Sequence, residues 1–349
     1  MKYLLSIFFI GICCSFLWGI FRKDRYERYD TFPEEKKIVS QEIPLSTDFR
    51  FPYRITIKEG FAILMDLHPE SYYYHLFTYP GWQPVAAFGK RGEGPKELLS
   101  ADGVQFISMD SIYTLDANRM LISRWAFSAT TQSVERVEDI SLDKELIRSL
   151  DFYRTEQQFL IPNYTGQCRY NEVSHTGKKL HDVGTIPTET YANQKNVALA
   201  QAWRTFADYH PKNRIYALVT QLGEVLEIYH LESGKRIVKY GPGGEPRFIE
   251  TSGRGIPMGI KGFMDVRVTE RYIYAIFDGL SWDERRKYQE RGEIPPEGGH
   301  FLYQFDLKGN PVRKYVLDRN IHGLEIDEKN NRVIAVSVEG EHPIITFQL

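Results

Sequence analysis

The chain has 349 residues, of which 42% are hydrophobic and 26% are charged, with a formal net charge of −2. This composition is ordinary for a globular protein, so it argues against wholesale disorder and against a membrane protein with many spans. A near-neutral charge also argues against nucleic acid as the main partner, because binding to phosphates needs a basic surface. Aromatic residues make up 14% of the chain, which favours a strand-rich structure.

The chain opens with an uncharged apolar run of 19 residues, from Tyr3 to Phe21. About 20 apolar residues span a bilayer as a helix, and no small-residue cleavage site follows the run. We therefore predict that residues 1–21 form an uncleaved membrane anchor. A cleaved signal and a lipoprotein signal that uses Cys13 or Cys14 are the alternatives. A buried helix of the domain is the least favoured interpretation.

The next segment, residues 22–36, is charged and polar, and we interpret it as a tether. Beyond the apolar run, Cys168 is the only cysteine. A disulfide within the soluble part is therefore impossible, and a cysteine-rich zinc module is excluded.

Residues 37–349 repeat one pattern six times: a β-rich run, a polar turn and a second β-rich run. Polar turns between such runs indicate hairpins. The six segments are ITIKEGFAILM (55–65), VQFISMDSIYTLD (104–116), LDFYRTEQQFLIP (150–162), FADYHPKNRIYALV (206–219), VRVTERYIYAIF (266–277) and LEIDEKNNRVIAV (324–336). The second runs begin near Ile63, Ile112, Phe159, Ile215, Ile273 and Val333, at spacings of 49, 47, 56, 58 and 60 residues. Periods of this size are typical of four-stranded propeller blades.

A third strand is expected in every unit, and a fourth in most of them. The third strands are predicted at 72–78, 121–127, 170–175, 225–231, 301–307 and 344–349. Three of the fourth strands open with a glycine turn and a basic residue, at 176–184, 233–241 and 308–317.

The last unit lacks a fourth strand, because the sequence stops at Leu349. A propeller must close its ring to avoid exposed strand edges. The stretch KIVSQEIPL (37–45) contains β-formers, so we predict that it completes the final blade. The predicted fold is an all-β six-bladed propeller. An N-terminal apolar helix is expected before the propeller, and within the propeller helix is expected only at Asp143–Leu150 and Ser281–Arg291.

Residues 88–127 resemble the blade junction of NHL-type proteins and the TolB-like six-bladed propellers of exported Bacteroidetes proteins. The matching residues are Phe88, Gly89, Gly92, Gly94, Pro95, Glu97, Gly103, Val104, Ile112, Tyr113, Asp116 and Asn118. A weaker match to the same motif lies at YGPGGEPRF (240–248). The resemblance implies the fold and an exported location, but it carries no catalytic residue. The basic residues after the apolar run would by themselves favour a cytoplasmic domain; with the resemblance, we predict the extracytoplasmic side.

The motif of Phe88, Gly89, Gly92, Gly94, Pro95 and Glu97 has a structural interpretation as the joint between two blades. Its glycines permit positive φ or close backbone approach, and Pro95 stiffens the exit. The alternative is an anion clamp formed by Lys90, Arg91 and Lys96. The motif is not a P-loop, because the G-K-[ST] ending is absent.

Catalytic and metal-binding patterns are weak. Loops expected near the central channel contain Asp48, Glu93, Asp102, Glu189, Glu245, Asp318 and His322, but at none of the usual ligand spacings. G-x-S-x-G is absent, and Cys168 with His175 is an improbable catalytic pair. We predict no metal, no cofactor and no catalytic residue.

Two insertions extend beyond a minimal blade, at 246–262 and 281–299. Long loops on rigid scaffolds often bind partners, and Trp, Tyr and Arg are favoured anchors of interfaces. Trp282, Arg285, Arg286 and Tyr288 are therefore candidate binding residues. A short solvated helix packed on the fifth blade is an equally weighted alternative.

Two functions follow from these observations. The first is a monomeric, membrane-tethered propeller in the cell envelope that binds a protein or glycan partner without catalysis. The second is a metal-dependent hydrolase or lyase with its site at the channel mouth, which requires three or more carboxylate or histidine side chains to converge there.

Overall fold

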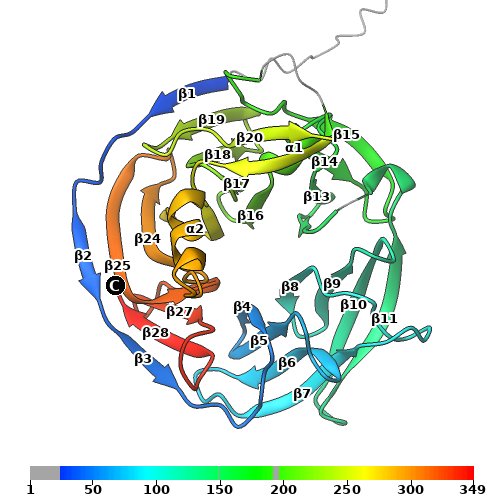
Figure 1. The fold of residues 1–349 in the computed structure, drawn as a ribbon. Helices are drawn as coiled ribbons and strands as arrows, with labels where there is room; N and C mark the ends of the chain where they lie inside the picture. Colours follow the sequence, from blue (N-terminus) through cyan, green and yellow to red (C-terminus); the bar gives the residue numbers. More distant parts are fainter. Residues whose placement is uncertain (1–23, 148, 192–195) are drawn as a thin grey trace, which may run out of the picture.

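The computed structural model describes residues 24–147, 149–191 and 196–349. Six blades of four strands each are arranged around a central axis, and two of them are extended by a fifth strand at the outer edge. This arrangement confirms the predicted six-bladed β-propeller (Figure 1). In five of the six blades the four strands follow one another outward from the axis in sequence order. The predicted membrane anchor at residues 1–21 lies outside the described residues.

The first three blades follow one another without insertion of a long element. Blade one consists of β4 (Pro52–Lys58), β5 (Phe61–Asp66), β6 (Tyr72–Thr78) and β7 (Pro84–Lys90). Blade two consists of β8 (Gly103–Ser108), β9 (Ser111–Asp116), β10 (Leu121–Ser128) and β11 (Ser133–Ser141). Blade three consists of β12 (Tyr153–Arg154), β13 (Phe159–Pro162), β14 (Tyr170–Val173) and β15 (Lys179–Val183).

The last three blades carry the additional elements. Blade four consists of β16 (Thr205–His210), β17 (Ile215–Thr220), β18 (Val225–His230) and β19 (Lys235–Tyr240). Blade five consists of β22 (Phe263–Val268), β23 (Tyr272–Phe277), β24 (Gly299–Asp306) and β25 (Pro311–Ile321). Blade six consists of β26 (Gly323–Asp327), β27 (Arg332–Val336), β28 (Ile344–Gln348) and the N-terminal strand β3 (Ser40–Ile43).

The core is divided among the interfaces between neighbouring blades, and each interface has its own apolar cluster. The second strand of each blade is almost wholly buried; all six residues of β17 are buried, for example. Continuous apolar runs of this kind are expected where a strand is covered on both faces. Each blade can therefore bury its faces only when both neighbours are present.

The N-terminal segment runs along the outside of three blades, as the blue strands of Figure 1 show. β1 (Asp24–Arg28) pairs in parallel with β19, β2 (Glu35–Ile38) pairs in parallel with β25, and β3 pairs antiparallel with β28. The tether prediction for residues 22–36 is therefore wrong for the residues of β1 and for Glu35 and Lys36. The outermost strands present unpaired backbone groups, and the passing chain satisfies them.

Two short helices and a hairpin lie outside the blades. Helix α1 (Val197–Ala202) precedes blade four, the β20 (Arg247–Thr251) and β21 (Arg254–Met258) hairpin follows it, and α2 (Trp282–Glu290) interrupts blade five. α2 agrees with the helix expected at 281–291; a capping box between Ser281 and Glu284 begins it. The helix predicted at 143–150 is wrong, because only the 3₁₀ turn Lys144–Leu146 forms there.

Candidate functional site

A cavity of about 770 Å³ follows the axis of the propeller. All six blades line it through their innermost strands; β4 contributes every residue from Tyr53 to Lys58. A volume of this size lies within the range of pockets that bind one small ligand. The cavity is therefore the candidate functional site.

The polar lining comes from charged residues within short β-rich runs. Arg54 lies on β4, Asp208 on β16, Arg267 on β22 and Glu325 on β26. The side chains of Arg54, Arg267 and Glu325 keep 13%, 14% and 19% of their surface exposed. Charges so nearly desolvated require partners.

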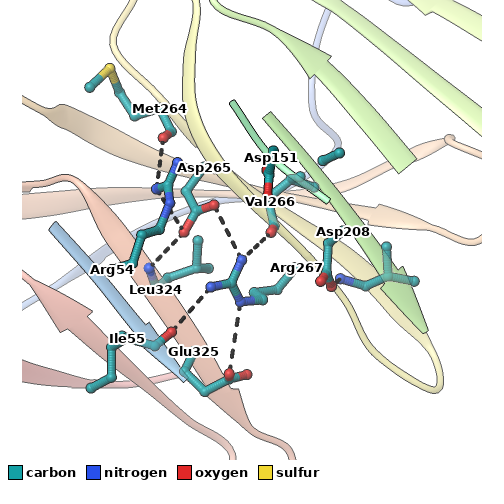
Figure 2. A network of polar contacts seen from close by, with 12 residues as sticks. Arg54, Ile55, Asp151, Asp208, Met264, Asp265, Val266, Arg267, Leu324 and Glu325 are labelled. Atoms are coloured by element: carbon teal, nitrogen blue, oxygen red, sulfur yellow. Dashed lines mark hydrogen bonds and ion pairs between the residues drawn. The ribbon is translucent and has the colours of Figure 1, made fainter. Parts of the chain in front are cut away.

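Asp265 supplies the partner for both arginines (Figure 2). One carboxylate oxygen lies 3.2 Å from Nη1 of Arg54 and the other lies 3.2 Å from Nη1 of Arg267. The backbone N–H of Leu324 also donates to Asp265 at 3.1 Å. This carboxylate from blade five thus joins an arginine of blade one to the first strand of blade six.

Arg267 extends the network to the neighbouring backbone. It donates to the carbonyl of Ile55 at 3.1 Å and to that of Val266 at 2.8 Å, and its Nε lies 3.8 Å from Glu325. Burial alone would lower the pKa of Arg267, but the charges of Asp265, Asp208 and Glu325 outweigh it and raise the pKa. Both arginines are therefore neutralised by the protein itself.

Asp151 and Asp208 lie beside this network (Figure 2), and their carboxyl groups have raised pKa values. Burial raises the pKa of Asp151 to about 7 against the opposing charge of Arg54, and it raises the pKa of Asp208 to about 7 against that of Arg267. Asp151 accepts from Tyr153 Oη at 2.9 Å, and Asp208 accepts from the N–H of Val268 at 2.7 Å. Near neutral pH each carboxyl exists in both forms, so each can donate or accept a hydrogen bond.

Aromatic rings make up much of the remaining surface. The guanidinium of Arg54 lies 4.5 Å from the ring centre of Tyr53 and 4.6 Å from that of Phe206. Tyr164 donates from its hydroxyl to the carbonyl of Thr205 at 3.0 Å, so its ring is fixed on the cavity wall. The cavity therefore offers rigid apolar faces beside polar groups.

The candidate binding residues of α2 lie outside this cavity. Trp282 is 36% exposed, and the side chain of Arg286 is 64% exposed beside Asp283. Tyr288 lines a separate groove of about 380 Å³ between α2 and the end of β25, with His300 and Asn320. Trp282 and Arg286 thus lie on the exposed part of α2, and Tyr288 lies in the groove beside it.

Arg285 does not fit the predicted binding role. It is 9% exposed, forms an ion pair with the buried Asp278 and donates to the carbonyl of Pro296 at 3.2 Å. Arg285 is the buried residue of α2, whereas Trp282 and Arg286 are exposed, so Arg285 marks the side of the helix that faces blade five. Arg285 holds α2 on blade five.

The glycine motif lies at the joint between blades one and two. Gly89 has φ +66° and an added Cβ would lie 2.7 Å from the ring of Tyr74, so only glycine fits. Glu97 accepts from the N–H of Gly94 at 2.9 Å and from Lys90 at 2.8 Å. Phe88 is buried and stacks on Tyr74.

Two residues of the alternative anion clamp already have partners. Lys90 pairs with Glu97, and Arg91 donates to the carbonyl of Pro69 at 3.0 Å. Pro95 and Lys96 belong to the same turn between β7 and β8. This geometry agrees with the interpretation of the motif as a structural joint.

The metal candidates do not converge. Asp102 lines the central cavity, whereas Asp318 lies in the groove beside α2 and Glu245 contacts Thr190 at the rim. Across the described ranges, three or more His, Cys, Asp or Glu side chains placed to hold one metal ion are not found. Cys168 is buried beside Asp182, and burial raises the pKa of its thiol to about 12, which makes it a poor nucleophile.

Five charged residues that line the cavity were not among the predicted site residues: Arg54, Asp151, Asp208, Arg267 and Glu325. A signal was available, because a charged residue stands inside or at the edge of the first β-rich run of several units. A charge at such a position must face either an ion pair or the axis.

Among the described residues, the helices are too short or too polar to span a bilayer.

Comparisons with known proteins agree with the fold. A predicted exported protein of Bacteroides fragilis is 10% identical, with a TM-score of 0.53 over 93% of this chain and 98% of that one. A DUF4221 family member of Bacteroides vulgatus is 8% identical, with a TM-score of 0.55 over 89% and 95%. Virginiamycin B lyase of Staphylococcus aureus is 10% identical, with a TM-score of 0.51 over 90% and 100%.

At such identities the likeness concerns the fold alone. Among curated proteins, none matches this sequence. The family model described as TolB-like 6-blade propeller-like matches residues 29–329, which is most of the chain. The protein therefore belongs to the TolB-like six-bladed propeller family.

Proposed function

We propose that this protein is a membrane-tethered, extracytoplasmic binding protein that holds a glycan in its central cavity without catalysis. The observation that carries the proposal is the composition of the cavity wall, which contains both aromatic rings and carboxyl groups around a space of about 770 Å³. A sugar ring presents an apolar C–H face and a rim of hydroxyls, so it requires both kinds of surface.

The electrostatics favour a neutral ligand over a charged one. Asp265 and Glu325 neutralise Arg54 and Arg267, so these arginines do not attract an external anion strongly. Asp151 and Asp208, with pKa values raised to about 7 by burial, are partly protonated near neutral pH. Hydroxyl groups that both donate and accept hydrogen bonds suit such carboxyls.

The alternative, a metal-dependent hydrolase or lyase, has less support. It requires convergent metal ligands at the channel mouth, and the described residues do not supply such a group. Virginiamycin B lyase shares the fold at 10% identity, which does not transfer its reaction to this chain.

Two observations support the proposed membrane-tethered, extracytoplasmic location. The apolar run from Tyr3 to Phe21 is long enough for a bilayer span, and a structural neighbour from Bacteroides fragilis is a predicted exported protein. The pairing of β3 with β28 further supports our proposal that the N-terminal strand closes the ring.

The test is calorimetric titration of the full chain, in mild detergent, with a panel of soluble oligosaccharides. We expect at least one to bind, and we expect Phe206→Ala and Asp208→Asn to weaken that binding, because each removes part of the cavity wall. Glu232→Gln, on an exposed outer turn of blade four, is the matched control. Failure of every oligosaccharide to bind would refute the glycan proposal, and release of cleaved sugar would favour the hydrolase.

Trp282, Arg286 and Tyr288 remain a proposed second surface for a protein partner. Trp282 and Arg286 are exposed on α2, so they are free to contact one. Capture of a defined envelope partner should weaken in the Trp282→Ala, Arg286→Ala double variant. Undiminished capture would remove this surface from consideration.

A further inference from the structure

The β20–β21 hairpin separates its side chains into two chemically distinct sets. Phe248 is 7% exposed and packs with α1 and blade four, whereas its neighbour Ile249 is 54% exposed. Because side chains alternate along a strand, every second residue points away from the protein. The outward residues, which we call the hairpin face, are Arg247, Ile249, Thr251, Arg254, Ile256 and Met258.

The hairpin face joins exposed apolar groups to unpaired positive charge. Ile249 and Ile256 are direct cross-strand neighbours, and Met258 is opposite Arg247. Ile256 is 50% exposed and Met258 is 41% exposed. Neither Arg247 nor Arg254 forms an ion pair with another described residue, and the face includes no acidic residue.

The geometry of the turn keeps this face in place. Ser252 and Gly253 both have positive φ, at 52° and 72°, as a tight two-residue hairpin turn requires. Gly255 lies so close to the carbonyl of Ala198 that an added Cβ would be 2.7 Å from it, so the inner side is seated on α1. Packing of the inner side of the hairpin on α1 therefore keeps the apolar residues of the hairpin face exposed.

The hairpin and the first strand of the described chain both lie next to blade four. β1 pairs with β19, and β20 begins seven residues after β19 ends. Arg28 at the end of β1 bonds Glu189, and the N–H of Glu189 donates to Glu245 beside the hairpin. Figure 1 shows both elements on the same side of the ring.

We infer that the hairpin face docks on the surface of an anionic lipid bilayer, an inference that rests on the proposed membrane tethering. The predicted anchor ends at Phe21, three residues before Asp24 begins β1. Three residues of extended chain reach at most about 11 Å. Blade four must therefore stay close to the bilayer, where the hairpin face meets lipid at high effective concentration.

The chemistry of the face fits an anionic interface. Isoleucine and methionine side chains enter the acyl boundary, while arginines at the edge attract acidic headgroups. The Ile249–Ile256 pair lies between Arg247 and Arg254. An apolar centre with basic ends on a rigid hairpin is complementary to such a surface.

The test uses the full chain reconstituted in vesicles of phosphatidylcholine with phosphatidylglycerol. A benzophenone amino acid replaces Ile256 or, as the control, Thr130 on the exposed β10–β11 turn of blade two. We expect lipid adducts at position 256 to exceed those at position 130 several-fold. Arg247→Gln with Arg254→Gln should lower them, by about fivefold per arginine at a surface in equilibrium.

The outcomes separate the two proposals. If the chain does not float with the vesicles, the tethering proposal fails. If it floats but position 256 gives no more lipid adducts than position 130, the hairpin faces water or a protein, and the docking inference is overturned. Equal adducts in vesicles of phosphatidylcholine alone would overturn the requirement for anionic lipid.

Discussion

Arg169 of blade three and Glu227 of blade four form a buried ion pair through two guanidinium nitrogens of the arginine. Nε and Nη2 of Arg169 lie 2.9 and 2.6 Å from the same carboxylate oxygen, and both side chains are at most 1% exposed. Arg236 and Tyr229 donate to the other oxygen at 2.6 and 3.0 Å. The pair joins two blades by charge as well as by apolar packing.

Replacement of this carboxylate should be severely destabilising. Burial alone would raise the pKa of Glu227, but the charges of Arg169 and Arg236 hold it below the ordinary value. Glu227→Gln removes the negative charge that the buried Arg169 and Arg236 share, so we expect a loss of about 3–5 kcal/mol in the free energy of unfolding. Chemical unfolding at neutral pH measures it.

The matched control is Glu138→Gln, which breaks the exposed pair with Arg124. There we expect a loss of at most about 1 kcal/mol. Equal losses in the two variants would show that burial of the pair between blades three and four has no special role.

The raised pKa of Asp208 predicts a pH dependence of stability. The native carboxyl keeps its proton to about pH 7, whereas the unfolded one loses it near pH 4. Between these values the native state binds more protons, so this group makes the protein less stable as pH rises. Above pH 7 its effect is constant.

Asp208→Asn should remove that dependence and still accept from Val268. Relative to the wild type, the variant should gain stability between pH 5 and pH 7 by at most about 1.4 kcal/mol per pH unit. Unfolding curves at several pH values test this, with Glu232→Gln as the control. Parallel pH profiles for the wild type and the variant would contradict a raised pKa.

His322 should act with the opposite sign. Burial, together with the charges of Lys261 and Arg54, lowers its pKa to about 4. Neither ring nitrogen has a hydrogen-bond partner among the described residues, and the ring packs against Phe51 and Tyr53. Between about pH 4 and pH 6.5 the unfolded state binds more protons, so acidification in this window destabilises the protein.

His322→Phe keeps an aromatic ring and removes the titration. Relative to the wild type, it should gain stability as the pH falls from 6.5 to 4.5, by at most about 1.4 kcal/mol per pH unit. A variant whose acid sensitivity matches that of the wild type would assign the effect to other groups.

The N-terminal strand of blade six offers a test of ring closure. Replacement of Ser40–Ile43 by Gly-Ser-Gly-Ser removes strand propensity and the buried part of Ile43, which packs beside Ile344. Since the edge of β28 is then exposed, we expect a clear fall in the melting temperature. The same four residues in place of 129–132, an exposed turn, should change it little, and similar falls in both would refute the closure.

The sequence alone determined the fold and most strand positions. All six predicted second runs coincide with strands, from Ile63 in β5 to Val333 in β27. Strand alternation, polar turns and a period near 50 residues are local properties, so they remain visible without tertiary structure. The helix at α2 was likewise predicted, because a helical period is also a local property of the sequence.

Only the tertiary structure decided what lies in the cavity and which charges are buried. Asp208 and Arg267 stand in ordinary β-rich runs, and nothing local shows that both face the axis. Arg285 and Arg286 are neighbours, yet one is buried against Asp278 and the other is exposed. The parallel pairing of β1 with β19 was equally hidden, since it joins residues more than 200 positions apart. Burial, pKa and pairing depend on groups that are distant in sequence, and only the closed ring brings those groups together.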